Sequence, residues 1–235
     1  MRIGGLQKTS VIDFPGRLAC TVFTQGCNFA CPFCHNKDLV GGKEVELVGE
    51  DYFFKFLKKR KDILEGVCIT GGEPCLQPGL LDFCKKIKET GLTIKLDTNG
   101  SRPETLEELL KEKVLDMVAM DVKGQFGDYK KITKLKITNY ELRIKESIRT
   151  ILESGVEYEF RTTVVPELHD KTSLVKLAAR LRQDYGEVNW VLQKFRASQN
   201  CLDKRYRKKK SFSDEEMEGF LKAVKKVLPK TTLRV

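Results

Sequence analysis

Short runs of β-branched and apolar residues alternate with longer amphipathic stretches along most of the chain. The short runs predict strands, and apolar positions spaced three to four residues apart predict helices. The expected strands cover residues 17–24, 66–70, 92–96, 114–120, 157–165 and 188–193. The expected helices cover residues 50–61, 78–90, 103–111, 139–154, 171–185 and 213–228, the last with Ser213 and Glu216 in a capping box. This regular alternation predicts right-handed crossovers and a parallel sheet.

The number of predicted strands favours a partial barrel. A complete eightfold α/β barrel usually needs ~250 residues, and this chain has 235. An open (β/α)6 TIM-like barrel therefore fits the pattern better. The sequence has no internal repeat and no low-complexity linker. We therefore expect one α/β domain over residues 1–235, whose C-terminal part at 201–235 carries a basic segment and the last helix.

Composition and charge narrow the class of protein further. The apolar fraction of 40% and the charged fraction of 32% allow a sizeable core and exclude wholesale disorder, a collagen or a coiled-coil rod. No apolar run approaches the ~18 residues that span a membrane, and the N-terminus lacks an apolar signal region, so we expect a cytoplasmic protein with no membrane partner. A net charge of +10 favours an acidic partner, which on composition alone is nucleic acid, an acidic protein or an anionic cofactor.

Polar and glycine-rich motifs follow the ends of several predicted strands. They are Gly26-Cys27, Gly71-Gly72-Glu73, Asp97-Thr98-Asn99 and Asp121-Val122-Lys123. In parallel sheets, ligands bind at the carboxyl ends of the strands. We therefore expect these motifs to lie on one functional rim.

Three of the eight cysteines, Cys27, Cys31 and Cys34, share the loop at residues 26–36. Soft thiolates at this spacing select zinc or an iron–sulfur cluster. Zinc would need a fourth ligand, and His35 directly follows Cys34, where it reaches the same tetrahedral ion only with strain. A cubane cluster normally has four Cys ligands, so three thiolates leave one iron open to another ligand. Three small buried hydrophobic residues are the plainer alternative, but the loop is also rich in Gly, Asn and Pro.

The other strand-end motifs each permit a plain and a functional interpretation. Gly71-Gly72 forms an ordinary turn or lets a ligand approach the backbone, and Glu73 supplies an anion suited to an ammonium group. Asp97 begins an Asx turn, or it holds a hydroxyl or a cation. Lys123 neutralises Asp121 or binds a carboxylate.

These residues resemble a known family. The pattern C-x-x-x-C-x-x-C followed by Gly-Gly-Glu-Pro resembles that of radical S-adenosylmethionine (SAM) enzymes. Gly5-Leu6-Gln7-Lys8-Thr9-Ser10, together with Ile12-Asp13-Phe14-Pro15-Gly16, resembles the activating proteins of anaerobic ribonucleoside-triphosphate reductase. Cys34-His35-Asn36 and Asp97-Thr98-Asn99-Gly100 are shared with the similar pyruvate formate-lyase activating enzymes. The resemblance covers nearly the whole chain.

The resemblance implies the radical SAM fold, a chemistry and a set of site residues. In that family the methionine part of SAM chelates the fourth iron of a 4Fe-4S cluster, the cluster donates one electron, and the 5′-deoxyadenosyl radical that forms takes a hydrogen from a glycine of a partner enzyme. The cluster ligands implied here, and with them the catalytic centre, are Cys27, Cys31 and Cys34. The residues implied for SAM are Asn36, Gly71, Gly72, Glu73, Asp97, Thr98, Asp121, Lys123, Arg161 and Gln193. Asp97, Thr98 and Asp121 also resemble the set that holds a monovalent cation.

The match weakens towards the C-terminus. Arg161 lies in Arg161–Pro166, which matches the family's fifth strand, whereas Gln193 stands where pyruvate formate-lyase activators have a His. No Cys-rich ferredoxin-like segment follows the first motif, which argues against activators with extra clusters.

The remaining cysteines and His169 are assigned from their sequence context. Cys75, beside Pro74, is most simply a small filler residue on the rim, and the polar loop around Cys201 allows an exposed thiol with no assigned role. A lone loop histidine such as His169 is expected to be solvated. The cysteines expected in the core are Cys20, Cys68 and Cys84.

Residues 204–210 contain six cations in seven positions. Like charges in a row repel, so the segment is expected to be extended and solvated. A functional alternative is docking of an acidic partner such as a flavodoxin, or of the target reductase. Nucleic acid is not expected as a partner, because only Tyr206 interleaves an aromatic ring.

The function predicted from the sequence is that of an oxidoreductase: a radical SAM activase that generates a glycyl radical on anaerobic ribonucleotide reductase. The enzymatic alternatives are an activator of another glycyl-radical enzyme and a radical SAM enzyme that acts on a small molecule. Outside enzymes, an iron–sulfur electron carrier or a zinc-ribbon module would use the cysteines, but it would leave Glu73, Asp97 and Lys123 without a role.

Overall fold

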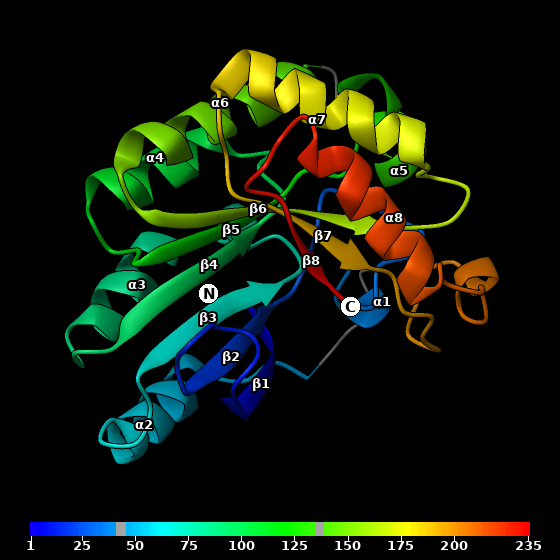
Figure 1. Cartoon of the computed structure of the whole chain (residues 1–235). Coiled ribbons are helices and arrows are strands. Elements are labelled where there is room, and N and C mark those ends of the chain that lie inside the picture. The colour runs from blue at the N-terminus through cyan, green and yellow to red at the C-terminus, as the bar shows by residue number, and fades with distance from the viewer. Residues whose placement is uncertain (41–45, 135–138) are drawn as a thin grey trace. The chain divides into compact units, whose positions relative to one another are not determined.

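A computed structural model describes residues 1–40, 46–134 and 139–235 (Figure 1). The strands are β1 (Ile3–Ser10), β2 (Ala19–Thr24), β3 (Gly66–Gly71), β4 (Thr93–Thr98), β5 (Met117–Asp121), β6 (Glu157–Val164), β7 (Trp190–Lys194) and β8 (Thr232–Arg234). The α-helices are α1 (Lys37–Val40), α2 (Glu50–Arg60), α3 (Leu80–Lys88), α4 (Pro103–Lys111), α5 (Tyr129–Thr133), α6 (Tyr140–Ser154), α7 (Lys171–Tyr185) and α8 (Asp214–Lys225). Short 3-10 turns cover Pro74–Leu76, Phe126–Asp128 and Lys204–Tyr206.

The strands form one sheet in chain order, β1 to β8. Strand β1 runs antiparallel to β2, while the pairs β2–β3, β3–β4, β6–β7 and β7–β8 are parallel. Parallel neighbours that follow each other in sequence need a crossover connection, and helices supply it. The predicted α/β class with a parallel sheet is confirmed.

The contacts of the chain divide it into two compact units. The first comprises residues 1–28, 38–119 and 142–158, and the second comprises 29–37, 120–141 and 159–235. The first unit contains strands β1 to β4 with helices α2, α3 and α4. The second contains β7 and β8 with α5, α7 and α8.

Burial accounts for the apolar sequence of the parallel strands β2 and β3 in the first unit. Strands β2 and β3 are buried along nearly their whole length. Both faces of such a strand are covered, so it appears in the sequence as a continuous apolar run. The predicted core cysteines Cys20, Cys68 and Cys84 are indeed buried, each with 0% exposure. Cys75 is buried as well, which fits the filler role predicted for it.

All six predicted strands and all six predicted helices are present, with ends that shift by a few residues. The capping box at Ser213 and Glu216 is formed as predicted. Strands β1 and β8 were not predicted. The first is largely polar and partly exposed, and the second has only three residues, so neither shows an apolar run.

Within the three described ranges, no helix combines the length and the apolar character that crossing a bilayer requires.

Candidate functional site

Cys27 follows β2, in the first unit, beside two asparagines. The Asn99 side-chain amide lies 3.8 Å from the Cys27 sulfur and donates to Asn28 Oδ1 at 3.0 Å. Asn28 in turn donates to Ser101 Oγ at 2.7 Å. The loop after β4 therefore supports the first cysteine of the motif through a chain of side-chain hydrogen bonds.

Cys31 and Cys34 belong to the second unit and form a turn in which the Cys34 amide donates to the Cys31 carbonyl at 3.0 Å. The Asn36 amide donates to the Cys34 sulfur at 3.4 Å. Burial raises the pKa of the Cys31 thiol to about 11, although the Lys123 ammonium lowers it in part. Burial also raises the pKa of Cys34.

The donor chemistry of the loop fits an iron–sulfur cluster. All eight cysteines are thiols rather than disulfides, and three of them lie on one segment of eight residues. Soft sulfur ligands without a fourth protein donor at the same spacing suit such a cluster better than a closed zinc site. In the described part of the chain, no three His, Cys, Asp or Glu side chains are already gathered around one metal-ion position.

A distant segment of the second unit holds the Cys31–Cys34 turn. The Leu202 amide donates to the Cys34 carbonyl and the Asp203 amide to the Pro32 carbonyl, both at 2.9 Å. His35 Nε2 donates to the Arg196 carbonyl at 2.7 Å. Residues 196–203 thus act as a backbone brace for the cysteine loop.

Cys201 lies within this brace and is not exposed, contrary to the expectation from the sequence. This residue has 0% exposure, and its sulfur lies 3.8 Å from the Phe33 carbonyl oxygen. It is not an exposed thiol, because the polar residues around it face outwards while its own side chain packs against the cysteine loop.

The basic segment is not extended as expected. Lys204–Tyr206 form a 3-10 turn capped by the Asp203 carboxylate, and the Tyr206 ring is buried. Lys209 pairs with Glu167 at 2.5 Å and lies over the Tyr206 ring. A buried aromatic anchor and local ion pairs thus offset the repulsion between neighbouring cations.

Gly71-Gly72 brings β3 against the end of β2. Gly71 has a φ of +106°, which side chains disfavour, and a Cβ on Gly72 would overlap the Gly26 carbonyl oxygen. The Gly72 amide donates to the Thr24 carbonyl and the Glu73 amide to the Gly26 carbonyl, both at 2.8 Å. The two glycines are required for this backbone contact, whether or not a ligand also approaches them.

Glu73 is completely buried and its carboxylate is engaged inside the first unit. Oε1 accepts from the Cys75 amide at 3.0 Å and from Thr98 Oγ1 at 2.7 Å, and Oε2 accepts from the Asn99 amide at 2.7 Å. Burial raises the pKa of Glu73, while these three donors lower it. The carboxylate therefore fixes the loops after β3 and β4, and its predicted contact with the SAM ammonium stays a prediction.

Asp97 ends β4 beside a lysine that the motif analysis did not single out. Lys95, 1% exposed, donates to Asp97 Oδ1, and Thr70 Oγ1 donates to Asp97 Oδ2 at 3.2 Å. Residues two apart in a strand point to the same face, so Lys95 and Asp97 share one. A lysine inside the apolar run 92–96 was the sequence signal for this pair.

Asp121, Lys123 and Arg161 form an ionic cluster in the second unit. Lys123 Nζ lies 2.6 Å from Asp121 Oδ2, and Arg161 Nε lies 3.0 Å from Asp121 Oδ1. Burial alone would raise the pKa of Asp121, but the two cations outweigh it and lower this pKa to about 2. Lys123 thus neutralises Asp121, which is one of the two roles considered for it, and its binding of a ligand carboxylate stays a prediction. Gln193 lies opposite Thr163 and Arg234 in the sheet register.

His169 is buried, which corrects the expectation of a solvated side chain. Nδ1 accepts from the Val165 amide at 3.0 Å, and Nε2 donates to the Lys123 carbonyl at 2.8 Å. Burial lowers its pKa. A neutral imidazole thus connects the end of β6 to the Lys123 backbone.

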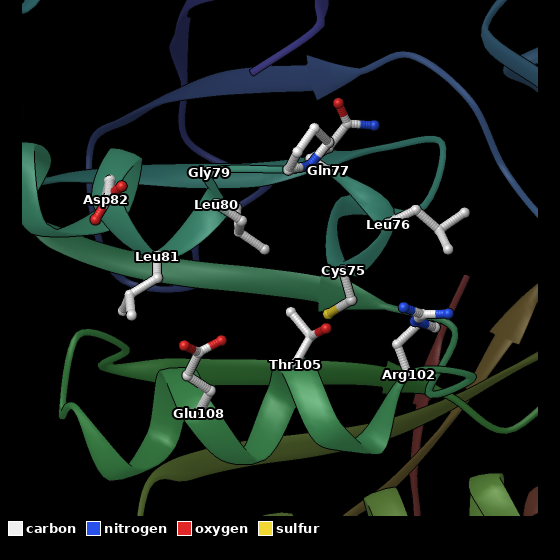
Figure 2. A pocket seen from close by; sticks show the side chains of 11 residues that line it. Cys75, Leu76, Gln77, Gly79, Leu80, Leu81, Asp82, Arg102, Thr105 and Glu108 are labelled. Atoms are coloured by element: carbon white, nitrogen blue, oxygen red, sulfur yellow. The ribbon is translucent and has the colours of Figure 1, made fainter.

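A surface pocket of about 500 Å³ lies within the first unit, between residues 75–82 and helix α4 (Figure 2). Arg102, Thr105 and Glu108 face it from the start and body of α4. The cluster and SAM residues predicted from the sequence are absent from its lining.

Comparison with known proteins identifies the family. The sequence profile of the radical SAM superfamily matches residues 21–178. A provisionally named glycyl-radical enzyme activating enzyme of Methanocaldococcus jannaschii is 31% identical over 99% of this chain and 95% of its own length. The pyruvate formate-lyase-activating enzyme of Clostridium pasteurianum is 32% identical over 81% of this chain and 79% of its own length.

The chain belongs to the glycyl-radical enzyme activating enzymes of the radical SAM superfamily. Membership implies a 4Fe-4S cluster and SAM as cofactors. The structure of Streptococcus suis SuiB bound to S-adenosylmethionine confirms the fold, with a TM-score of 0.68 at 12% identity. This alignment covers 89% of the present chain and 48% of SuiB, so the chain spans about half of that structure.

The Asp121 cluster yields a pH-dependent prediction. The folded pKa of about 2 lies below the ordinary 3.8, so the ion pairs stabilise the fold above pH 3.8, and this stabilisation is lost as the pH falls towards 2. Asp121→Asn should therefore cost about 2 kcal/mol near pH 6 and about 1 kcal/mol near pH 3. Urea unfolding of both proteins at the two pH values measures this difference, and an equal cost at both would contradict the assignment.

Proposed function

We propose that this chain is the activase of an anaerobic ribonucleoside-triphosphate reductase, on which it generates a glycyl radical. The observation that supports this target is the N-terminal segment that resembles such activators. In the structure it forms β1 and the following turn, where Val11 and Ile12 are 71% and 80% exposed. Exposed aliphatic side chains beside a family motif suit contact with a protein partner.

Three cysteines would hold the cluster, and the strand-end residues would hold SAM. When bound, the cluster supplies the electron that cleaves SAM. Cys27, Cys31 and Cys34 would serve as its ligands, and Asn36 would support Cys34 through the amide-to-sulfur contact. Glu73 would set the positions of Thr98 and Asn99 around the methionine end of SAM.

A second candidate is the activation of another glycyl-radical enzyme, such as pyruvate formate-lyase. The C. pasteurianum relative favours it, as does the shared Asp97–Gly100 motif. The two candidates differ in the partner, not in the cofactor chemistry.

The target is tested with purified partner enzymes under anaerobic conditions. We expect this chain, with SAM and dithionite, to produce a glycyl-radical EPR signal on anaerobic ribonucleotide reductase and none on pyruvate formate-lyase. The double variant Val11→Asp/Ile12→Asp should reduce radical formation on the reductase about tenfold while SAM cleavage without a partner stays unchanged. Ile63→Asp is the matched control, because Ile63 is 51% exposed on a different surface loop. A signal on pyruvate formate-lyase alone would reject the reductase in favour of the second candidate.

The cluster ligands generate a direct prediction. Cys27→Ala, Cys31→Ala or Cys34→Ala removes one of three thiolates, so each anaerobically reconstituted variant should lose most of its bound four-iron cluster and all SAM cleavage. Iron content, the visible absorption band and released 5′-deoxyadenosine measure this. Cys20→Ala is the control, because Cys20 is buried in β2 and should keep both properties. Equal iron loss in Cys20→Ala and Cys31→Ala would refute the ligand assignment.

The basic segment is proposed to receive an acidic electron donor such as flavodoxin. It directly continues the brace on the cysteine loop, so a donor docked there would lie next to the proposed cluster ligands. Lys204, Lys208 and Lys210 are exposed in this segment. Exposed charges are screened beyond ~8–10 Å at ordinary ionic strength, so docking by charge should be fastest at low salt.

Lys208→Gln/Lys209→Gln/Lys210→Gln should therefore slow reduction by flavodoxin at about 20 mM salt and have little effect at about 300 mM. SAM cleavage driven by dithionite, which needs no docking, should stay nearly unchanged. Lys58→Gln/Lys59→Gln/Lys61→Gln, at the end of α2, makes the same charge change elsewhere and should have no effect. Stopped-flow measurement of the flavodoxin reduction rate across the salt series tests this docking role. Identical rates for both triple variants would mean that residues 208–210 contribute to solubility alone.

A further inference from the structure

The Asp97 carboxylate is already paired with a cation from the chain itself, the ammonium group of Lys95. Lys95 lies on β4 in register with Cys68 of β3. Its Nζ donates to Asp97 Oδ1 and lies 3.9 Å from the Cys68 sulfur. Lys95 is 1% exposed, so its ammonium is held inside the first unit rather than in solvent.

A buried ammonium is retained only with a compensating partner, because the charged group loses its hydration. Asp97 supplies that charge, and Thr70 Oγ1 satisfies its second oxygen at 3.2 Å. A metal ion placed on the same carboxylate would meet the Lys95 ammonium at close range. Like charges that share a site shielded from water repel strongly.

The other residues that resemble a monovalent-cation set are also engaged. Thr98 Oγ1 donates to Glu73 and accepts from the Gly100 amide at 3.1 Å. In the second unit, Asp121 is neutralised by Lys123 and Arg161. A monovalent metal ion therefore does not fit the donor set of this chain.

We propose that the Lys95 ammonium takes the place of a monovalent metal cation at Asp97, so that SAM binding by this chain requires no alkali ion. This inference rests on the proposed role of Asp97 in the SAM site. Lys95 is a positioning residue in this proposal: it fixes the charge and orientation of Asp97 and does not touch the reacting atoms.

The first test uses the wild-type full chain. Thermal unfolding of the cluster-free protein and SAM binding to the anaerobically reconstituted protein are measured in KCl, NaCl and choline chloride at equal ionic strength. We expect the same Tm in all three salts and SAM affinities that agree within about twofold. A SAM affinity more than about fivefold weaker in choline than in KCl would overturn the proposal, because it would reveal a bound alkali ion.

The second test removes the built-in cation. Lys95→Met keeps most of the side-chain volume but leaves the charge of Asp97 uncompensated. In choline chloride, the SAM affinity of this variant should be at least about tenfold weaker than that of the wild type. In about 100 mM KCl or NaCl, the variant's SAM affinity should rise again by at least about fivefold. The Tm of the cluster-free variant should also be higher in KCl or NaCl than in choline. A folded Lys95→Met protein whose Tm is the same in every salt would overturn the proposal.

Lys88→Met is the control, because Lys88 forms a more exposed lysine–aspartate pair with Asp116 away from the proposed site. It should show no preference among the salts. If Lys95→Met does not fold, Lys95→Met/Asp97→Asn removes both charges and should fold without a preference among the salts. A salt preference in that double variant would contradict the proposal, since no carboxylate remains to bind the ion. Absence of SAM binding by the wild type in every salt would instead reject the proposed function, while the Tm comparison would still test Lys95.

Discussion

Acidic side chains at the carboxyl ends of buried strands must be neutralised or hydrogen-bonded, and this constraint sets the surroundings of Glu73, Asp97 and Asp121 in the candidate site. A carboxylate withdrawn from water costs several kcal/mol unless its environment compensates the charge. The two units use the same solution for an aspartate at a strand end. Asp97 receives the ammonium of Lys95, two residues earlier on β4, and Asp121 receives the ammonium of Lys123, two residues later.

Glu73 is compensated differently, and the difference bears on what it can do. Among the described residues, no Lys or Arg side chain pairs with it, but it accepts three hydrogen bonds, two of them from backbone amides. Such donors stabilise a negative charge without cancelling it. Glu73 is therefore stabilised by hydrogen bonds alone, whereas the charges of Asp97 and Asp121 are balanced by neighbouring cations. Of the acidic residues predicted for SAM, we therefore propose Glu73 as the partner of its ammonium group.

The sequence predicted the parts of the fold and site that depend on local pattern. Buried parallel strands appear as apolar runs, and the capping box at Ser213 appears as a fixed spacing. The cysteine spacing and the Gly-Gly-Glu-Pro run located the motifs, because their chemistry depends on adjacent residues. What the sequence did not reveal depends on partners far along the chain. The sequence context of His169 predicts a solvated loop residue, but in the fold the end of β6 and the Lys123 backbone enclose it. The polar context of Cys201 allows an exposed thiol, but in the fold its side chain packs on the cysteine loop.

The brace between residues 196–203 and the Cys31–Cys34 turn has a consequence for assembly of the second unit. The turn has only one internal backbone hydrogen bond among those described, from Cys34 to Cys31, while Leu202 and Asp203 supply two more from about 170 positions away. A loop closed over so long a distance gains its order late, because the closure entropy must be offset by contacts that exist only in the nearly complete fold. We therefore expect the Cys31–Cys34 turn to be fully organised only when the C-terminal segment has folded onto it. This would link the geometry of two proposed cluster ligands to the part of the chain where the family resemblance is weakest.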